Sequence, residues 1–313
     1  MSISRREFLE STAAGSLAAV TAHGAPAMPT RVLGKTGAKV SILAFGGGSR
    51  FVQYDEETGL LALNKALDLG ITYVDTAESY GNGESQKRIG KVFRARGGKK
   101  NIWLASKIGQ RNYDDFMRSL DQSLTRLEVD QVDLLHIHAL MGPDDLAKID
   151  APDGAYKAAV KAKEQKMARF IGITCHAYPD VLKKALEEHD FDCTQMALNA
   201  AQRAQVKDSP PCFETIALPV ARKKNMGIIA MKIFGQDALV GQAPAEKLIY
   251  YSMSLPVSAV VIGMPKLEYL EQNITLAKNF KPLSSEEMKV LAGELAPKNK
   301  YALDQFFRNH VDA

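Results

Sequence analysis

The chain has 313 residues, of which 46% are hydrophobic and 24% charged, an ordinary composition for a globular protein with a large core. Its formal net charge of +4, from 40 basic and 36 acidic residues, is too small to indicate a nucleic acid or an acidic partner. The 3 cysteines, Cys175, Cys193 and Cys212, have no metal-ligand or disulfide-framework spacing, so we expect small buried side chains.

The N-terminal segment resembles a twin-arginine export signal. Ser4-Arg5-Arg6-Glu7-Phe8-Leu9 precedes a small-residue apolar stretch at 11–22, with Ala25 and Ala27 as candidate cleavage positions. Neither this stretch nor any other reaches the ~20 apolar residues that span a bilayer, so we expect no stable membrane insertion. An amphipathic N-terminal helix that belongs to the fold is the alternative.

The export interpretation has several consequences. Residues 1–27 are then a signal peptide that is removed, and residues 28–313 form the mature domain. The resemblance implies the twin-arginine translocase as a partner during export. It also implies a periplasmic or otherwise exported protein that folds in the cytoplasm first, which agrees with a core built without disulfides.

Past this segment, residues 30–40 predict a short β-hairpin that turns at Lys35 to Gly37. Short β-rich apolar runs then alternate with amphipathic helical stretches, such as residues 57–69. The predicted strands are residues 40–45, 72–75, 102–107, 132–138, 170–174, 194–198, 227–231 and 259–262. Residues 283–313 have a helical pattern without a strand, and Pro282 and Pro297 are expected to bracket it.

Strands that alternate with helices predict βαβ units and a parallel sheet, and eight units predict a closed (β/α)8 TIM barrel of the α/β class. The hairpin would cap the barrel floor, and the C-terminal helical tail would pack on the barrel. A doubly wound open sheet is the competing architecture. It needs a Gly-x-Gly-x-x-Gly loop after the first strand, and Phe45-Gly-Gly-Gly-Ser49 lacks that spacing.

In such a barrel the active site lies where the strands end, and four polar residues stand there: Asp75, Tyr80, Lys107 and His138. Each alone has an ordinary structural explanation, but together they converge on one mouth. A free tyrosine has a pKa near 10, and a nearby ammonium lowers it by favouring the phenolate. Lys107 can supply that charge, and Asp75 can hold Lys107 in place. His138 can orient a substrate carbonyl by hydrogen bonding. Together these side chains fit a proton donor beside a carbonyl that receives a hydride.

These residues resemble the catalytic tetrad of the aldo-keto reductases. The motifs that carry the resemblance are Thr72-Tyr-Val-Asp75-Thr-Ala-Glu-Ser-Tyr80-Gly-Asn-Gly-Glu84, Leu104-Ala-Ser-Lys107, Asp133-Leu-Leu-His-Ile-His138 and Arg169-Phe-Ile-Gly-Ile-Thr174. Later segments from Gln195 to Asn273 follow in the family's order. The resemblance implies a barrel that binds NADP(H), with NAD(H) as the alternative, and reversibly reduces a small aldehyde or ketone, with a sugar among the candidates, to an alcohol. Tyr80 would be the general acid, tuned by Lys107 and Asp75, and His138 the carbonyl-orienting donor.

The resemblance also implies a set of cofactor-binding residues. They are Gly46, Gly47, Thr174, Gln195, Met231, Lys232, Gly263, Gln272 and Asn273. Three parts of this set depart from the family pattern. Thr174-Cys175 replaces the usual Ser-Asn at the carboxamide, so Thr174 and Gln195 would hold the nicotinamide with help from His176. Met231 stands where an aromatic residue usually stacks. Gly263 and Tyr269 replace basic partners of a 2′-phosphate, which leaves Lys232 and Lys266 as candidate ligands.

Two other functions fit parts of the sequence. His136 and His138 lie two apart on one strand and so face the same way, as a metal-ligating pair of a barrel hydrolase would, with His176 as a third ligand. A barrel that binds a nucleotide without turnover is the second alternative, because soluble nicotinamide cofactor is scarce outside the cytoplasm. The substrate depends on the loops and on the C-terminal tail, where Tyr301, Phe306 and Phe307 offer apolar surface.

Overall fold

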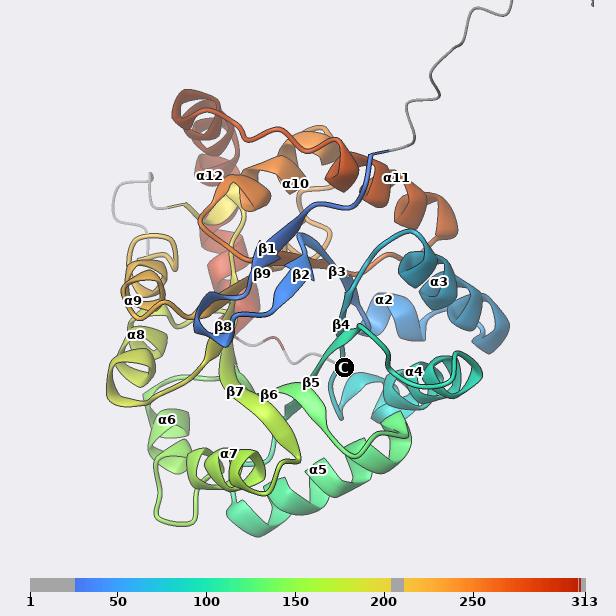
Figure 1. The fold of residues 1–313 in the computed structure, drawn as a ribbon. Coiled ribbons are helices and arrows are strands. Elements are labelled where there is room, and N and C mark those ends of the chain that lie inside the picture. The colour runs from blue at the N-terminus through green and yellow to red at the C-terminus, as the bar shows by residue number, and fades with distance from the viewer. Residues whose placement is uncertain (1–25, 204–210, 309, 311–313) are drawn as a thin grey trace, which may run out of the picture.

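The fold, taken from a computed structural model, is described for residues 26–203, 211–308 and 310. Eight parallel strands close into a barrel in the order β10-β3-β4-β5-β6-β7-β8-β9 (Figure 1). They are β3 (Leu43–Gly46), β4 (Tyr73–Asp75), β5 (Trp103–Ile108), β6 (Val132–Leu140), β7 (Ala168–Cys175), β8 (Cys193–Ala197), β9 (Gly227–Met231) and β10 (Ala259–Ile262). The predicted (β/α)8 barrel is confirmed.

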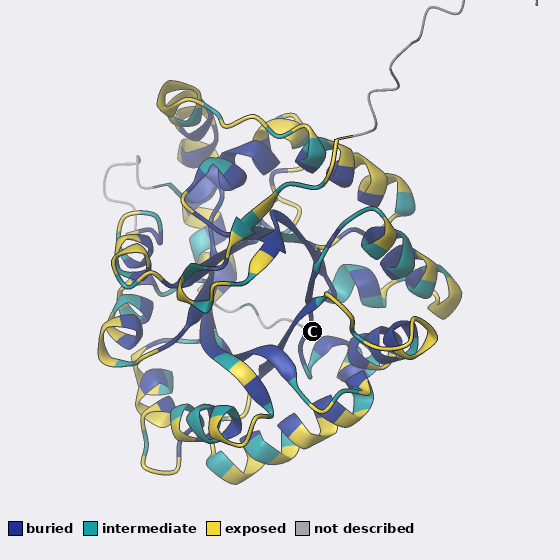
Figure 2. Ribbon diagram, in the orientation of Figure 1, coloured by how far each residue is buried: buried dark blue, intermediate teal, exposed yellow. Residues whose placement is uncertain are grey.

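Helices surround the barrel, each with a buried inner face and an exposed outer face (Figure 2). Besides the C-terminal helix described below, the longer ones are α3 (Glu56–Asp68), α4 (Glu84–Ala95), α5 (Tyr113–Leu127), α6 (Pro143–Ile149), α7 (Ala155–Glu164), α8 (Pro179–Glu188), α9 (Ala217–Lys223), α10 (Ala245–Ser254) and α11 (Leu267–Lys278). The shorter ones are α2 (Ser49–Val52) and the 3-10 turns η1 (Gly34–Thr36), η2 (Tyr80–Gly83) and η3 (Ala200–Gln202). Caps fix where helices begin: the Asp55 side chain accepts a hydrogen bond from the Thr58 amide at 2.8 Å at the start of α3.

A hairpin closes the barrel floor, as predicted. Strands β1 (Thr30–Val32) and β2 (Lys39–Ser41) pair antiparallel through the turn η1. Leu33 and Val40 are fully buried and pack with interior side chains of the barrel such as Trp103 and Leu134. Apolar packing therefore seals this end of the barrel.

The first predicted strand, residues 40–45, was wrong in its extent. Residues 39–41 belong to the hairpin, whereas the barrel strand β3 starts at Leu43. The Ser41 hydroxyl donates to the Leu43 carbonyl at 2.7 Å, and the Ile42 amide donates to the Pro29 carbonyl at 3.0 Å. These bonds bend the chain at Ile42, which a run of apolar residues does not reveal.

The strands that carry Lys107 and His138 end later than predicted. Strand β5 continues to Ile108 and strand β6 to Leu140, so Lys107 and His138 lie within strands instead of ending them. The pairing explains the extension, because Ile108 still pairs with Ile137 and Leu140 with Cys175. The pairing between β6 and β7 shifts register between Ile137 and Leu140, directly around His138.

The C-terminal tail forms one helix, α12 (Ser285–Arg308), packed on η3. Pro297 lies inside it, so the expectation that Pro282 and Pro297 bracket the tail was wrong. The buried apolar face continues from Leu295 to Leu303 on both sides of the proline, and this packing maintains the helix. Asp304 accepts from the Gln202 side chain at 3.0 Å, which ties the tail to the loop after β8.

The predicted signal segment falls almost wholly on residues 1–25, which lie outside the described residues, so the export signal and the boundary at residue 27 stay predictions. In the part of the chain that the structure describes, no helix is both long and apolar enough to cross a bilayer. Cys175, Cys193 and Cys212 are free and buried, as expected. Burial raises the pKa of the Cys175 thiol to about 12.

Candidate active site

The structure brings the four predicted catalytic side chains together at the mouth of the barrel. Asp75 ends β4, Tyr80 begins η2, Lys107 lies in β5 and His138 in β6. All four are buried, with exposed fractions of 2%, 6%, 1% and 5% respectively. Charged side chains are seldom buried to this degree unless they are paired, so the cluster calls for a chemical explanation.

Lys107 is the centre of the cluster. Its ammonium nitrogen Nζ donates to Asp75 Oδ1, to the Thr76 carbonyl at 2.9 Å and to the Tyr80 hydroxyl oxygen at 3.2 Å. These bonds use its three donors, and the Asp75 carboxylate compensates the buried positive charge. The ammonium therefore lies where it stabilises a negative charge on the Tyr80 oxygen.

A tight left-handed turn presents Tyr80 to this ammonium. Gly81, Asn82 and Gly83 have φ values of 57°, 53° and 88°. Two glycines and an asparagine are the residue types that adopt this region at low cost. The spacing of five between Asp75 and Tyr80 follows from a strand end that fixes the acid and a turn that brings the phenol back over the barrel.

His138 lies beside the phenol. The Tyr80 and His138 rings contact edge to face, with centroids 5.8 Å apart and planes at 81°. The phenol and the imidazole are thus adjacent polar groups of one buried site. A carbonyl oxygen bound between them would receive hydrogen bonds from both.

A cavity of about 310 Å³ opens beside these side chains. Asp75 and Tyr80 form part of its wall. Seven of the predicted cofactor-binding residues line it as well: Gly46, Gln195, Met231, Lys232, Gly263, Gln272 and Asn273. They come from β3, β8, the end of β9 and the residue after it, the loop after β10 and α11, so the cavity extends from the tetrad across the mouth.

Two predicted cofactor residues are not in the wall of this cavity. Gly47 follows β3, and its amide donates to the Asp75 carbonyl at 2.8 Å. The Thr174 hydroxyl accepts from the Ala139 amide at 2.7 Å. Both contacts hold the backbone next to a tetrad residue.

The cavity also contains residues that sequence reasoning missed. Arg50, in α2, forms an ion pair with Asp237, in the loop after β9, and both line the cavity. Phe234 supplies an aromatic side chain three residues after Met231. Arg50 could have been found from the sequence, because it lies just beyond β3 and after the glycine run 46–48. Asp237 and Phe234 lie in a long loop with no pattern to single them out.

Two features of the cavity fit a nicotinamide nucleotide. Gln195 is 2% exposed and lines the cavity, and its Oε1 has no hydrogen-bond partner among the described residues. A buried acceptor of this kind suits an amide donor such as the nicotinamide carboxamide. Lys232 supplies positive charge to the wall, which suits phosphate groups, whereas the charge of Arg50 is balanced by Asp237.

His136 lies in the barrel interior, with its imidazole against Gly172. Burial lowers its pKa well below the ordinary value, and the charges of Lys107 and His138 act in the same direction. His136 is therefore neutral. Within residues 26–203, 211–308 and 310, no three His, Cys, Asp or Glu side chains are grouped so that they could hold a metal ion.

Comparison with known proteins agrees with the geometry. The model of the aldo/keto reductase family matches residues 43–248. L-galactose dehydrogenase of Arabidopsis thaliana is 27% identical over 82% of this chain and 90% of its own length. Aldo-keto reductase yakc of Schizosaccharomyces pombe, whose name includes NADP(+), is 29% identical over 68% of this chain and 63% of its own length.

Among solved structures, the holo form of aldo-keto reductase AKR11C1 from Bacillus halodurans superimposes with a TM-score of 0.71. It shares 22% identity, and the match covers 87% of this chain and 99% of that one, which supports the fold. The matched family model spans the barrel strands that carry the tetrad. The chain belongs to the aldo/keto reductase family, and it is an NAD(P)-dependent oxidoreductase.

Proposed function

We propose that this protein interconverts an aldehyde or ketone and the corresponding alcohol, with Tyr80 as the general acid and base. The contact of 3.2 Å between Lys107 Nζ and the Tyr80 hydroxyl carries the proposal. Both groups are at least 94% buried. In a site with little water an ammonium at this distance strongly stabilises a phenolate, so Tyr80 can release a proton and recover it.

The bound nicotinamide supplies the chemistry of hydride transfer to or from the substrate carbon. The residues of this chain manage the proton. In reduction Tyr80 donates its hydroxyl proton to the carbonyl oxygen as negative charge develops there, and Lys107 stabilises the phenolate that remains. In oxidation the phenolate takes the alcohol proton. Asp75 keeps Lys107 in place, and His138 donates a hydrogen bond that orients the carbonyl oxygen.

NADP(H) is the cofactor that we propose, with NAD(H) as the alternative. The positive charge of Lys232 supports the choice, since this residue lines the cavity. Lys266 lies in the loop next to the lining residue Pro265. The name of the yakc relative, which includes NADP(+), agrees with this choice.

The substrate class that we propose is a small polar carbonyl compound, with sugars first. The support is the relative L-galactose dehydrogenase, which is similar over most of its length.

For the location of the protein we propose export by the twin-arginine route after folding, with cofactor bound beforehand. Replacement of Arg5 and Arg6 by lysine, followed by cell fractionation, tests it: retention in the cytoplasm is expected, and unchanged export contradicts the route.

The function is tested in two steps with the purified protein. Titration with NADPH and NADH, followed by protein fluorescence, measures both dissociation constants, and tighter binding of NADPH is expected. Loss of NADPH absorbance is then measured with a panel of aldoses, aliphatic aldehydes and ketones. Turnover with at least one class supports the proposal, whereas nucleotide binding without any turnover supports a non-catalytic nucleotide-binding barrel.

A further inference from the structure

Strand β6 contains a strained residue next to the site. Ala139 has a φ of 53°, a left-handed conformation that residues other than glycine rarely adopt. It directly follows His138 and lies at the register shift between β6 and β7. Such a residue persists only where its surroundings hold it, and strained residues of this kind cluster at functional sites.

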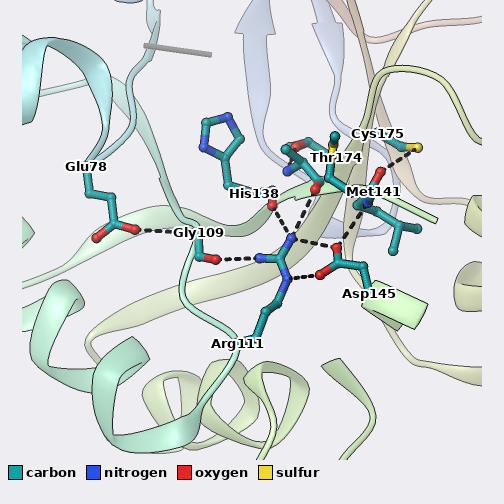
Figure 3. A network of polar contacts seen from close by, with 10 residues as sticks. Glu78, Gly109, Arg111, His138, Met141, Asp145, Thr174 and Cys175 are labelled. Atoms are coloured by element: carbon teal, nitrogen blue, oxygen red, sulfur yellow. Dashed lines mark hydrogen bonds and ion pairs between the residues drawn. The ribbon is translucent and has the colours of Figure 1, made fainter. Parts of the chain in front are cut away.

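Arg111 holds this turn from the neighbouring loop between β5 and α5. Its Nη2 atom donates to the His138 carbonyl at 2.8 Å and to the Ala139 carbonyl at 3.0 Å, and its Nη1 atom donates to the Gly109 carbonyl at 2.7 Å (Figure 3). The same side chain thus binds both carbonyls of the strained peptide units. The Ala139 amide is held from the other side by Thr174.

Asp145, in the first turn of α6, fixes Arg111 in turn. Its two carboxylate oxygens accept from Arg111 Nε and Nη2, both at 2.8 Å, and Oδ2 also accepts from the Met141 amide at 3.0 Å. Burial alone would raise the pKa of Asp145, but the hydrogen bonds and the charge of Arg111 hold it below its ordinary value. The pair is therefore charged at neutral pH, with the bidentate geometry that arginine favours.

The same network reaches the other side of the site. The Gly109 amide donates to Glu78 Oε1 at 2.6 Å, and the Glu78 amide donates to the Lys107 carbonyl at 3.1 Å. Glu78 lies two residues before Tyr80. The loop that carries Arg111 therefore links the turn after His138 with the segment that carries Tyr80.

We propose that Arg111 and Asp145 are positioning residues for catalysis, which hold the left-handed turn at Ala139 and thereby keep the His138 imidazole against the Tyr80 phenol. The inference rests on the proposed function of the tetrad and deepens it. Neither residue lines the cavity. Their effect on turnover is thus expected to pass through His138 and to leave cofactor binding unchanged.

The test compares Arg111→Met with Arg31→Met, a matched control at the floor. Arg31 also donates to two backbone carbonyls, those of Val257 and Met253, at 2.7 and 2.8 Å. We expect Arg111→Met to lower kcat about tenfold or more, since small misplacements of catalytic groups have effects of this size. The dissociation constant of NADPH should stay the same, and Arg31→Met should leave kcat unchanged even where it lowers the Tm.

A second comparison separates positioning from a general structural role. In a His138→Ala background, Arg111→Met should lower kcat by no more than about twofold, because residues that act through one another are not additive. A full tenfold loss in that background overturns the proposal, as does an equal loss of kcat in the Arg31 control. Asp145→Asn, a milder change that retains the shape of the side chain, should alter kcat in the same direction if Arg111→Met fails to fold.

The backbone gives a readout that needs no activity. The ¹³Cα and ¹³Cβ chemical shifts of Ala139 report its φ, and we expect them to leave the left-handed range in Arg111→Met and to stay there in Arg31→Met. Unchanged shifts in Arg111→Met overturn the proposal. A wild-type protein that reduces no carbonyl contradicts the proposed function instead, and the shifts still decide whether Arg111 holds the turn.

Discussion

The two ends of the barrel are built from the same strands but differ in what they bury. Strand β6 shows the change along one face: Leu134 packs in the apolar interior near the floor, His136 lies neutral above it, and His138 joins the tetrad at the mouth. The floor is closed by the hairpin, so apolar packing stabilises it. The mouth buries both partners of an ion pair, Lys107 and Asp75, whereas the buried carboxylate of Asp133 near the floor pairs with cations that reach solvent.

The strained residues differ in the same way. Near the floor, Lys166 and Asn225 have positive φ values just after helices α7 and α9, where a left-handed residue commonly ends a helix. At the mouth, Ala139 and Lys232 have positive φ values at the ends of strands. The left-handed residues of the floor thus serve the fold, whereas those of the mouth lie at the site and are held by side chains such as Arg111 and Asn199.

The largest expected effect comes from the loss of the buried charge at the mouth. Lys107→Met should lower kcat about a thousandfold, within the range for general acid and base catalysis, because the Tyr80 phenolate loses its stabilising charge. It should also lower the free energy of unfolding by about 3–5 kcal/mol, since Asp75 is left buried without its ion pair. Steady-state kinetics and urea denaturation measure the two effects.

Lys99→Met is the control at the floor. Lys99 also pairs with a buried carboxylate, Asp133, but this carboxylate keeps Arg169 and the Leu104 amide at 2.7 and 2.9 Å. The expected loss is about 1 kcal/mol with kcat unchanged. Equal losses of stability and of kcat in Lys107→Met and Lys99→Met would contradict the difference between the mouth and the floor.

The next effect concerns stability alone. Leu134→Ala should lower the free energy of unfolding by about 3 kcal/mol, because the residue is fully buried and leaves a cavity in the interior near the floor. The value of kcat per folded molecule should be unchanged. A loss of kcat larger than the loss of folded protein would show that the packing of the floor also sets the geometry of the mouth.

His136 predicts a dependence of stability on pH. Its pKa in the folded state is well below 6.5, so below about pH 6.5 the unfolded chain binds a proton that the folded protein does not. As the pH drops below about 6.5, the free energy of unfolding should therefore fall by up to about 1.4 kcal/mol for each pH unit. The full stability is present only above that pH. In His136→Gln the slope between pH 6.5 and 5 should be shallower by this amount, and parallel curves for the two proteins contradict a neutral buried imidazole.

The smallest effect concerns the strain at Ala139. Ala→Gly normally costs about 0.5–1 kcal/mol, because glycine loses more conformational freedom on folding. Ala139→Gly should cost less than this or stabilise the protein, because glycine adopts a φ of 53° without strain. Ala38→Gly, half-buried and without a positive φ, is the control and should show the full cost. Thermal denaturation of both variants compares them, and equal losses show that no strain is held at Ala139.

Much of the fold could be predicted from local patterns. The alternation of apolar strands and amphipathic helices gave the barrel, and the polar residues at strand ends marked the mouth. The errors lie where tertiary contacts overrule the pattern. The bend at Ile42 depends on a bond to Pro29, and α12 continues through Pro297 because its apolar face stays packed. Neither effect is encoded within a short window of residues.

The limits are similar in the site. The tetrad was predictable because each member lies at or near a strand end with chemistry of its own. Arg111 and Asp145 carry no such signal, since they are ordinary charged residues that the closure of the barrel brings together. Thr174 was expected at the nicotinamide, and this stays a prediction. The bond that its hydroxyl accepts from the Ala139 amide was not predictable, because it depends on the shifted register between β6 and β7.

The most direct test of the account compares Tyr80→Phe with Tyr73→Phe. Tyr73 is a fully buried tyrosine in the preceding strand, so the loss of its hydroxyl controls for removal of a buried oxygen. Single-turnover oxidation of bound NADPH by a carbonyl substrate should be about a thousandfold slower in Tyr80→Phe, with the NADPH dissociation constant unchanged, and as fast as wild type in Tyr73→Phe. Equal rates in wild type and Tyr80→Phe would contradict the central claim that Tyr80 donates the proton.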